Sequence, residues 1–316
     1  MGYGVVNGRI ARTLAVVGDR WSLAIIGELY AGRRRFGELR NLLGISRATL
    51  TRRLDVLLAE KMVCKTPYSA RRHEYDLDSK GKALGPFLLL AWRWEQVWSH
   101  EVSGSSPAQL FHLTCNDALV PTAFCSYCEQ PLVCGDLQLS EHVLQQAIIH
   151  RDFLPAVQTR RAEASASVIE PGVGLQRVVE LIADRWTLLI LIAVFFGVGR
   201  YEGFVQQLGI SSNSLASRLE RLVQVGILVR YDYQHNPPRS EYMAAVKGAS
   251  LFPVIMALRQ WAEDWGEGPM APPLLHSRCG HAAVLEVRCG HCRGELRPRN
   301  ISRARQVVSP LHSEHS

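Results

Sequence analysis

Eight histidines and cysteines stand at spacings that suit a metal ion. The chain contains His112-x2-Cys115-x9-Cys125-x2-Cys128, and the pattern returns as His276-x2-Cys279-x9-Cys289-x2-Cys292. Two close pairs of His or Cys ligands separated by a short loop match the tetrahedral coordination of zinc. Such a segment has almost no apolar core, so the metal would supply its folding energy. The spacing predicts one structural Zn²⁺ in each copy, about two per chain.

Other interpretations of these residues stay open. The thiols could be free, in a small hairpin packed against a larger domain. His281 or His291 could replace His276 as the fourth ligand, and Cys134 could serve in the first copy. No acidic residue is placed to act as the general base of a metal hydrolase, so we expect no catalytic zinc and no enzyme.

The repeat extends far beyond the Cys/His segments. Gly18-Asp19-Arg20-Trp21 returns as Ala183-Asp184-Arg185-Trp186, and Leu43-Gly44-Ile45-Ser46 returns as Leu208-Gly209-Ile210-Ser211. A repeat this long indicates a duplicated pair of domains rather than a solenoid. Each copy can therefore test an interpretation of the other.

Positive charge is concentrated in the first copy. The net charge of the chain is +7. In residues 1–93 Lys and Arg together far outnumber Asp and Glu, whereas residues 94–150 contain no Lys or Arg. A basic block confined to one part of a chain favours a polyanionic partner such as DNA, although a solvated basic face is the simpler alternative.

The elements around this block predict a winged helix. Apolar residues recur at helical spacing over residues 12–31, 35–43 and 47–60, with Gly44 ending the second helix and Ser46 as an N-cap of the third. Two short helices joined by a tight Gly-containing turn are typical of a helix-turn-helix. Strands at residues 62–66 and 73–77 then form a wing, and a helix over 80–100 closes the unit. The second copy repeats each part, with helices expected over residues 175–196, 201–208 and 212–225, wing strands at 227–233 and 240–244, and a closing helix over 247–265.

The outward side of the third helix would meet DNA. With Leu50, Leu54 and Leu57 turned inward, Ala48, Arg52 and Asp55 point outward. Arg contacts guanine and phosphate, and Thr contacts either base edges or a thymine methyl. In the first copy we expect DNA contacts from Arg33, Arg34, Arg35, Arg47, Thr49, Thr51, Arg52, Arg53, Arg71 and Arg72, with an internal ion pair as the alternative for Arg53. The second copy offers Ser212, Asn213, Ser217, Arg218 and Arg239, a less charged set that we expect to bind DNA more weakly.

The order of these motifs resembles the HxlR type of winged-helix transcriptional regulator. Gly18-Asp19-Arg20-Trp21 is similar to the first-helix motif of that family, and Arg34-Arg35-Phe36-Gly37-Glu38-Leu39 to its Arg-Phe-x-x-Leu segment. Gly44 to Leu54 resembles the start of its recognition helix, and Glu74-Tyr75 with Lys80-Gly81 its wing exit. The first wing lacks the Pro-Pro of the family, and the second copy has Tyr201-Glu202-Gly203-Phe204 in the Arg-Phe-x-x-Leu segment. The resemblance implies a DNA-binding regulator, although the usual member is a single-domain homodimer.

Two hypotheses follow for the second copy. Either the two winged helices mimic a dimer within one chain, or the second, less charged copy has become a platform for dimerisation or ligand sensing. The alternative function is a protein-interaction scaffold, or one that senses a ligand or redox state, in which the second winged helix no longer binds DNA. Cys64 could then be a redox switch, although a small buried apolar residue is the favoured interpretation. Trp92, Trp94, Trp98, Trp261 and Trp265 could line a ligand pocket, but a core or interface is commoner.

These expectations combine into an α+β, mainly α protein. We expect winged helices at residues 1–102 and 171–268, zinc-ribbon-like Cys/His modules at 103–140 and 269–316, and a linker at 141–170. Double-stranded DNA is the expected partner, with a homodimer or an intramolecular pseudo-dimer as the assembly and an unknown effector. No signal peptide or membrane span is apparent, so the expected location is the cytoplasm.

Overall fold

The computed structural model describes residues 16–69, 72–98, 109–139, 175–236, 238–267 and 273–303. The expected contact from Arg71 and the linker expected at 141–170 lie outside these residues. No helix in the described ranges is long and apolar enough to span a bilayer.

The first half is a winged helix. Its elements are α2 (Arg20–Tyr30), α3 (Phe36–Leu43), α4 (Arg47–Ala59), β1 (Val63–Ser69), β2 (Arg72–Leu77), α5 (Ser79–Lys82) and α6 (Gly85–Trp98). Gly44 ends α3 in a left-handed conformation with a φ of 57°, which glycine adopts without steric cost. Ser46 then caps α4, because its side chain accepts a hydrogen bond from the Thr49 backbone N–H. The predicted helix-turn-helix and wing are confirmed.

The second half repeats this order. Its elements are α9 (Gln176–Ala183), α10 (Arg185–Phe195), α11 (Tyr201–Leu208), α12 (Ser212–Gln224), β7 (Leu228–His235), β8 (Pro238–Ala244), α13 (Val246–Ala249) and α14 (Phe252–Trp265). The single helix expected over residues 175–196 is wrong, because Asp184 interrupts it. The Asp184 carboxylate accepts from the Trp186 N–H and begins α10 as a new helix. Asp19 acts in the same way on Ser22 at the start of α2, so the helix expected over 12–31 is also interrupted.

The closing helices are divided as well. The helix expected over residues 80–100 consists of α5 and α6, and the one expected over 247–265 consists of α13 and α14. The backbone at each short helix lies very close to the residue that precedes the first strand of its wing: a Cβ added to Gly81 would clash with the Met62 carbonyl oxygen, and one added to Gly248 with that of Ile227. Both glycines are therefore required by close backbone approach.

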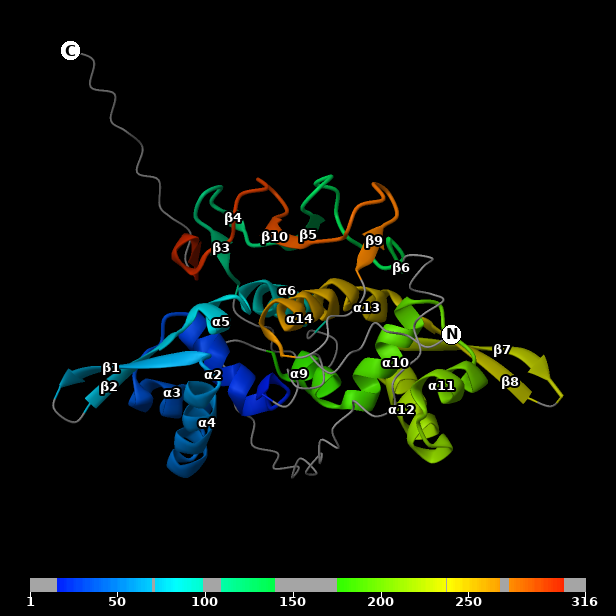
Figure 1. The fold of residues 1–316 in the computed structure, drawn as a ribbon, viewed down its shortest axis with the longest axis horizontal. Helices are drawn as coiled ribbons and strands as arrows, with labels where there is room; N and C mark the ends of the chain where they lie inside the picture. Colours follow the sequence, from blue (N-terminus) through cyan, green and yellow to red (C-terminus); the bar gives the residue numbers. More distant parts are fainter. Residues whose placement is uncertain are drawn as a thin grey trace, which may run out of the picture.

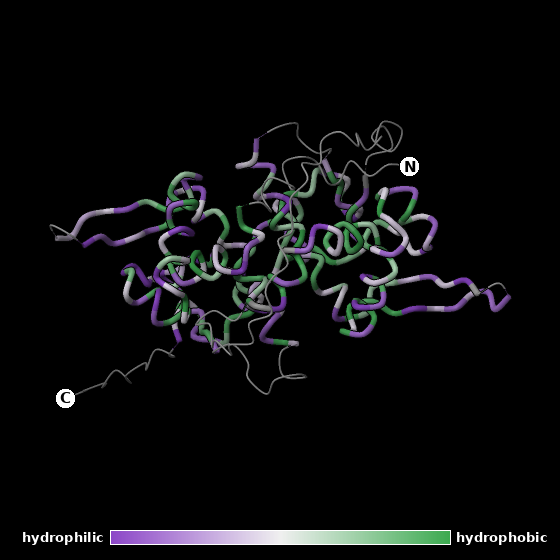
Figure 2. The backbone as a smooth tube through the Cα atoms, turned by 90° about the horizontal axis from the view of Figure 1, so that it is seen from below, coloured by the Kyte–Doolittle hydropathy of each residue, from purple (hydrophilic) through white to green (hydrophobic). Residues whose placement is uncertain are grey.

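The two halves are related by an approximate two-fold axis, which is vertical in Figure 1 and points toward the viewer in Figure 2. The largely hydrophilic wings project to opposite sides, and hydrophobic segments concentrate between them. Reciprocal bonds mark this axis: Trp94 Nε1 donates to the Lys247 carbonyl at 3.1 Å, and Trp261 Nε1 donates to the Lys80 carbonyl at 2.9 Å. Each indole thus contacts the opposite half through the equivalent position.

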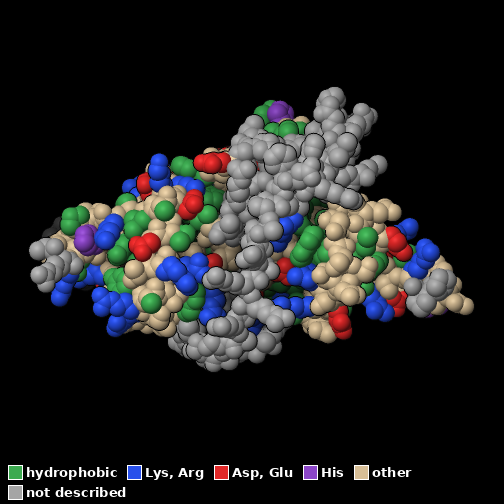
Figure 3. Space-filling view, turned by 60° about the horizontal axis from the view of Figure 1, so that its bottom comes forward, with side chains coloured by type: hydrophobic (Ala, Val, Ile, Leu, Met, Phe, Trp, Pro, Cys, Tyr) green, Lys and Arg blue, Asp and Glu red, His purple; other side chains and the backbone are tan. Residues whose placement is uncertain are grey.

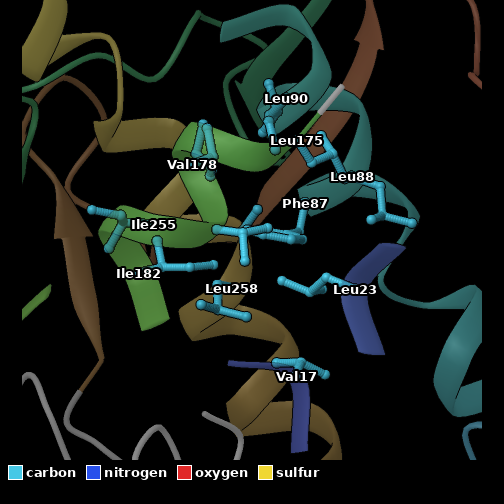
Figure 4. Close-up of a cluster of buried hydrophobic side chains, with 14 of the residues drawn as sticks. Val17, Leu23, Phe87, Leu88, Leu90, Leu175, Val178, Ile182, Ile255 and Leu258 are labelled. Carbon is cyan, nitrogen blue, oxygen red and sulfur yellow. The ribbon is translucent and has the colours of Figure 1, made fainter. Parts of the chain in front are cut away.

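One hydrophobic core serves both halves. Leu23 and Phe87 from the first half lie in the same buried cluster as Val178, Ile255 and Leu258 from the second, as Figure 4 shows. Glu95, which is 3% exposed, accepts from the backbone N–H groups of Arg177 and Val178 at 2.6 and 2.8 Å. A carboxylate of α6 therefore stabilises the N-terminus of α9, and the tryptophans near the axis belong to this interface.

The Cys/His segments lie on one side of the molecule, above α6 and α14 in Figure 1. Their strands are β3 (Phe111–His112), β4 (Asp117–Ala118), β5 (Pro121–Cys125), β6 (Leu137–Leu139), β9 (Leu274–His276), β10 (Leu285–Cys289) and β11 (Ile301–Ser302). Strand β5 pairs with β10, β6 with β9, and β3 with β11, all antiparallel. Each of these ladders joins a strand of one segment to a strand of the other.

Candidate nucleic-acid interface and metal centres

The outward face of α4 is open. Arg47, Ala48, Thr51, Arg52 and Asp55 are all exposed in the described structure, while Leu50, Leu54 and Leu57 are buried behind them. Ala48, Thr51 and Arg52 line a shallow depression along this face. The sequence placed these side chains on the correct side of the helix, since the helical period and the leucine positions fix both faces.

The side chains of Thr49 and Arg53 each contact another side chain of the same chain. Thr49 Oγ1 lies 2.9 Å from Ser46 Oγ in the cap of α4. Arg53 Nη2 lies 2.9 Å from Asp19 Oδ1, so the internal ion pair is the alternative that the structure displays. Arg218 makes the equivalent contact, with Nε 2.8 Å from Asp184 Oδ2. Both pairs join the recognition helix to the N-cap of the helix behind it.

The arginines before α3 lie against the wing. Arg34 Nη1 is 3.3 Å from Asp76 Oδ2, and Arg35 Nε is 3.1 Å from Glu74 Oε1. The hydrogen bond and the charge of Glu74 raise the pKa of Arg35. Arg33 is half-buried, while Arg72 on β2 is exposed. The side chains of Arg34 and Arg35 thus hold the wing onto the helices in addition to offering surface charge.

One equivalent residue was missed in the sequence. The Arg200 guanidinium lies 5.1 Å from the centre of the Tyr233 ring, just as that of Arg35 lies 5.2 Å from the centre of the Tyr68 ring. The repeat offset could have identified Arg200, because it precedes α11 as Arg35 precedes α3.

The exposed face of α12 carries less positive charge. Ser212, Asn213 and Ser217 are exposed, and Glu220 and Arg221 follow them on the same helix. Figure 3 shows more Lys and Arg side chains over the first winged helix, at the left, than over the second, at the right. The repeat places Ser217 at the position of Arg52, so the second helix lacks the central arginine of the first.

The second wing is partly neutralised. Arg230 Nε on β7 lies 3.1 Å from Asp232 Oδ1, and the Ser240 hydroxyl donates to the same carboxylate oxygen at 2.6 Å. These bonds from Ser240 and Arg230 lower the pKa of Asp232, which keeps its negative charge on this wing. Arg239 is exposed near the tip.

The eight His and Cys residues form two clusters, and the members come from both halves. One cluster contains His112, Cys115, Cys289 and Cys292. The other contains Cys125, Cys128, His276 and Cys279. The expected grouping of four ligands within each copy is therefore wrong. The pairing of β5 with β10 explains the exchange, since it places Cys125 opposite Leu285 and Cys289 opposite Pro121 across the two-fold axis.

The clusters have the dimensions of a tetrahedral site. His112 Nδ1 lies 3.4 Å from Cys115 Sγ and 3.3 Å from Cys292 Sγ, and Cys115 Sγ lies 3.9 Å from Cys289 Sγ. A zinc ion bonded to sulfur at about 2.3 Å and nitrogen at about 2.0 Å would separate its ligands by roughly 3.5–3.8 Å. In the second cluster His276 Nδ1 lies 3.3 and 3.4 Å from Cys128 and Cys279 Sγ. Both clusters could hold a metal ion.

The surroundings of the two imidazoles differ. Both rings are fully buried, and His276 Nε2 lies 3.9 Å from Asp136 Oδ2. This separation is longer than a hydrogen bond, and the Nε2 atoms of His112 and His276 have no hydrogen-bond partner among the described residues. The repeat places Asn300 at the position of Asp136, and its amide bonds to Arg297 and Glu295 instead. Burial raises the pKa of the Cys115 thiol to about 11, whereas a metal ion binds the thiolate form.

The remaining candidates lie outside the clusters. His281 stacks on Tyr127 with ring centres 3.3 Å apart, and Cys134 and His291 are members of neither described cluster. Cys64 is exposed on β1, so the interpretation of it as a buried apolar residue is wrong. Its Sγ lies 3.6 Å from the carbonyl oxygen of Asp76.

Comparison with known proteins decides the family. The model of the HxlR-like helix-turn-helix family matches residues 16–103 and 181–269, more than half of the chain. The chain belongs to the HxlR-like helix-turn-helix family. The two matches also support the tandem duplication, and this HxlR-type chain is a DNA-binding transcriptional regulator.

Similar proteins each match less than half of the chain. The uncharacterized HTH-type transcriptional regulator Rv3095 of Mycobacterium tuberculosis is 41% identical over 133 residues, which is 42% of this chain and 84% of that protein. The regulator sll1512 of Synechocystis is 35% identical over 94 residues, 29% of this chain and 70% of that protein. The crystal structure of PA1607 is 30% identical and covers 44% of this chain and 97% of its own, with a TM-score of 0.37.

Proposed function

We propose that a single chain of this HxlR-type regulator binds one DNA duplex with both of its winged helices. In this proposal α4 reads bases in a major groove through Arg47, Thr51 and Arg52, and α12 makes weaker contacts through Ser212, Asn213 and Ser217. The wings contact the backbone or a minor groove through Arg72 and Arg239. Helix-turn-helix proteins place the N-terminal part of the recognition helix against base edges.

The observation that carries the proposal is the two-fold relation of the halves. It places α4 and α12 on the same side of the molecule, away from the Cys/His segments (Figure 1). Dimeric helix-turn-helix proteins present two recognition helices to successive grooves by the same kind of symmetry. The reciprocal bonds of Trp94 and Trp261 and the shared core support the idea that one chain does what two chains do in a homodimer.

Binding to the chain's own promoter region over a series of salt concentrations tests this proposal. We expect the affinity to exceed that for a random duplex of equal length, and to fall steeply with salt as phosphate contacts release counterions. Equal affinity for both duplexes, or no dependence on salt, would contradict it.

The proposal includes one structural Zn²⁺ in each of the two Cys/His clusters. The Cys3His donor sets and the inter-ligand distances support zinc, which here would hold the halves together as well as fold the Cys/His segments. Each ion would be bound by four residues, two from the first half and two from the second. Metal analysis of the purified chain should find about two zinc ions per chain, and a chain free of zinc that keeps its fold would refute this part.

A further inference from the structure

A groove separates the first winged helix from the second Cys/His segment. Its volume is about 1590 Å³, and its walls come from α2 and α6 on one side and from β10, β11 and the residues between them on the other. Its apolar lining includes Tyr30, Leu89 and Trp92 from α2 and α6, and Leu296 and Ile301 from the second Cys/His segment. Of the elements that form its walls, α6, β10 and β11 lie on the side of the molecule opposite to α4 and α12 (Figure 1).

The groove is strongly basic. Seven Lys or Arg side chains line it against three carboxylates, those of Asp76, Glu286 and Glu295. Three of the basic groups have carboxylate partners, since Arg34 pairs with Asp76, Arg288 with Glu286, and Arg297 with Glu295. Lys82 and Arg299 are exposed and form no ion pair with any residue that the structure describes. The groove therefore holds positive charge that its own carboxylates leave uncompensated.

This charge is specific to one side of the molecule. In the repeat, Arg34 and Lys82 correspond to Gly199 and Ala249. The five arginines of the second Cys/His segment that line the groove correspond to residues of the first that carry no positive charge: Phe124, Glu129, Val133, Gly135 and Leu139. The strand pairings fix this alignment, because Leu137 faces His276 as Ile301 faces His112. Basic residues gathered from three separate segments at one groove, and at none of their symmetry equivalents, indicate a binding site rather than a general basic surface.

We propose that this groove binds an amphipathic organic anion, with an apolar body along Leu89, Trp92 and Ile301 and an anionic head at Lys82 and Arg299. Ligand sites combine an apolar lining with a few polar groups that fix orientation. A nucleic acid fits less well, because the apolar lining offers it no phosphate contacts and because the proposed DNA face lies on the other side. The inference goes beyond the proposed function, since it assigns a small-molecule effector site to a surface apart from the exposed faces of α4 and α12.

Titration calorimetry on the zinc-loaded full chain tests the site. The probes are decanoate and decyl phosphate, each below its critical micelle concentration. The controls are decanol, which has the apolar body without the anionic head, and acetate and inorganic phosphate, which have an anionic head without the apolar body. We expect at least one of the two amphipathic anions to bind, and all three control compounds to bind at least tenfold more weakly. Binding of neither amphipathic anion, or equal binding of its isolated head or body, would overturn the proposal.

The double substitution Lys82→Ala with Arg299→Ala locates the site. We expect it to weaken binding of the amphipathic anion at least tenfold, with an unchanged thermal midpoint and unchanged affinity for promoter DNA. The matched control is Lys65→Ala on the first wing, which should leave anion binding unaltered. The assignment would be overturned if the double variant and the control had equal effects on anion binding, because the anion would then bind elsewhere. It would also be overturned if the double variant lowered only the affinity for DNA.

Discussion

The two winged helices share a scaffold and differ in the side chains that they expose. In both, the helix behind the recognition helix begins at an aspartate, and this aspartate pairs with an arginine of the recognition helix. The pairs are Asp19 with Arg53 and Asp184 with Arg218. The exposed positions have diverged: the first helix has Arg52 where the second has Ser217. The internal pairs are common to both halves because they support the fold, whereas the exposed side chains can change without disturbing it.

The wings show the same contrast. Lys65 on the first wing is exposed, whereas Arg230 at the equivalent position of the second pairs with Asp232. Since phosphate neutralisation supplies most non-specific affinity for DNA, the second half should contribute shape and register more than charge. The Cys/His clusters differ from both, because each is assembled from the two halves together and neither belongs to one half.

Substitution of cysteines in pairs should give the largest effects and tests the exchange of ligands. Cys115→Ser with Cys289→Ser removes two ligands from one cluster and should leave about one zinc per chain. Cys115→Ser with Cys125→Ser damages both clusters and should leave none, with a loss of stability on the order of 10 kcal/mol in coordination free energy at each site. Metal analysis and thermal unfolding measure both outcomes.

The control for this experiment is Cys134→Ser, which lies outside both clusters and should keep two zinc ions. If Cys115→Ser with Cys125→Ser retained one zinc ion, the ligands would be grouped within each copy and the exchange between halves would be wrong.

Charge reversal on the two recognition helices tests their unequal roles. Arg52→Glu should lower the affinity for promoter DNA at least tenfold, because a base contact of about 1–3 kcal/mol is lost and a repulsive charge is added. Ser217→Glu at the equivalent position should lower it by only about threefold, because little positive charge is present to be cancelled. Fluorescence anisotropy at fixed salt measures both, and equal losses would mean that the two helices contribute alike.

The tryptophans at the two-fold axis test the equivalence of the halves. Trp94→Phe and Trp261→Phe each remove one indole hydrogen bond to a backbone carbonyl and should each cost roughly 0.5–1.5 kcal/mol of unfolding free energy. Trp265→Phe is the control, since Trp265 is 39% exposed and its indole forms no hydrogen bond with the residues that the structure describes. Denaturant unfolding compares the three, and a loss for only one of the axial tryptophans would argue against symmetric packing.

The internal ion pairs should give the smallest effects. Arg53→Ala and Arg218→Ala should each lower the unfolding free energy by about 0.2–1 kcal/mol, because the pairs are partly exposed and screened by solvent. Arg221→Ala, an exposed residue of α12 outside the described ion pairs, is the control. A much larger loss of DNA affinity than of stability for Arg53→Ala would show that this side chain leaves Asp19 to contact DNA.

The sequence was sufficient where short-range patterns decide the structure. Helical periodicity, Gly44 and Ser46 predicted the helix-turn-helix and the outward face of α4, and the spacing of the eight ligands predicted two clusters. The breaks at Asp19 and Asp184 were missed because an apolar period of 3.6 continues across them, while the capping bond depends on where one carboxylate points.

The exchange of ligands could not be predicted for a different reason. Both copies carry the same four positions, so each His-x2-Cys pair meets an equally suitable Cys-x2-Cys pair in either copy. The choice is made by pairing of β5 with β10 across the two-fold axis, which is a long-range contact that local spacing does not encode. The basic groove is also invisible in the sequence, since α2, α6 and β11 meet only in the folded chain.

The central claim is that one chain presents two recognition helices to one duplex. Footprinting of the promoter, combined with the mass of the complex, tests it most directly. We expect one chain per duplex and two protected segments a whole number of helical turns apart, with the segment contacted by α4 surviving to higher salt. A single protected segment, or two chains on every occupied site, would contradict the account.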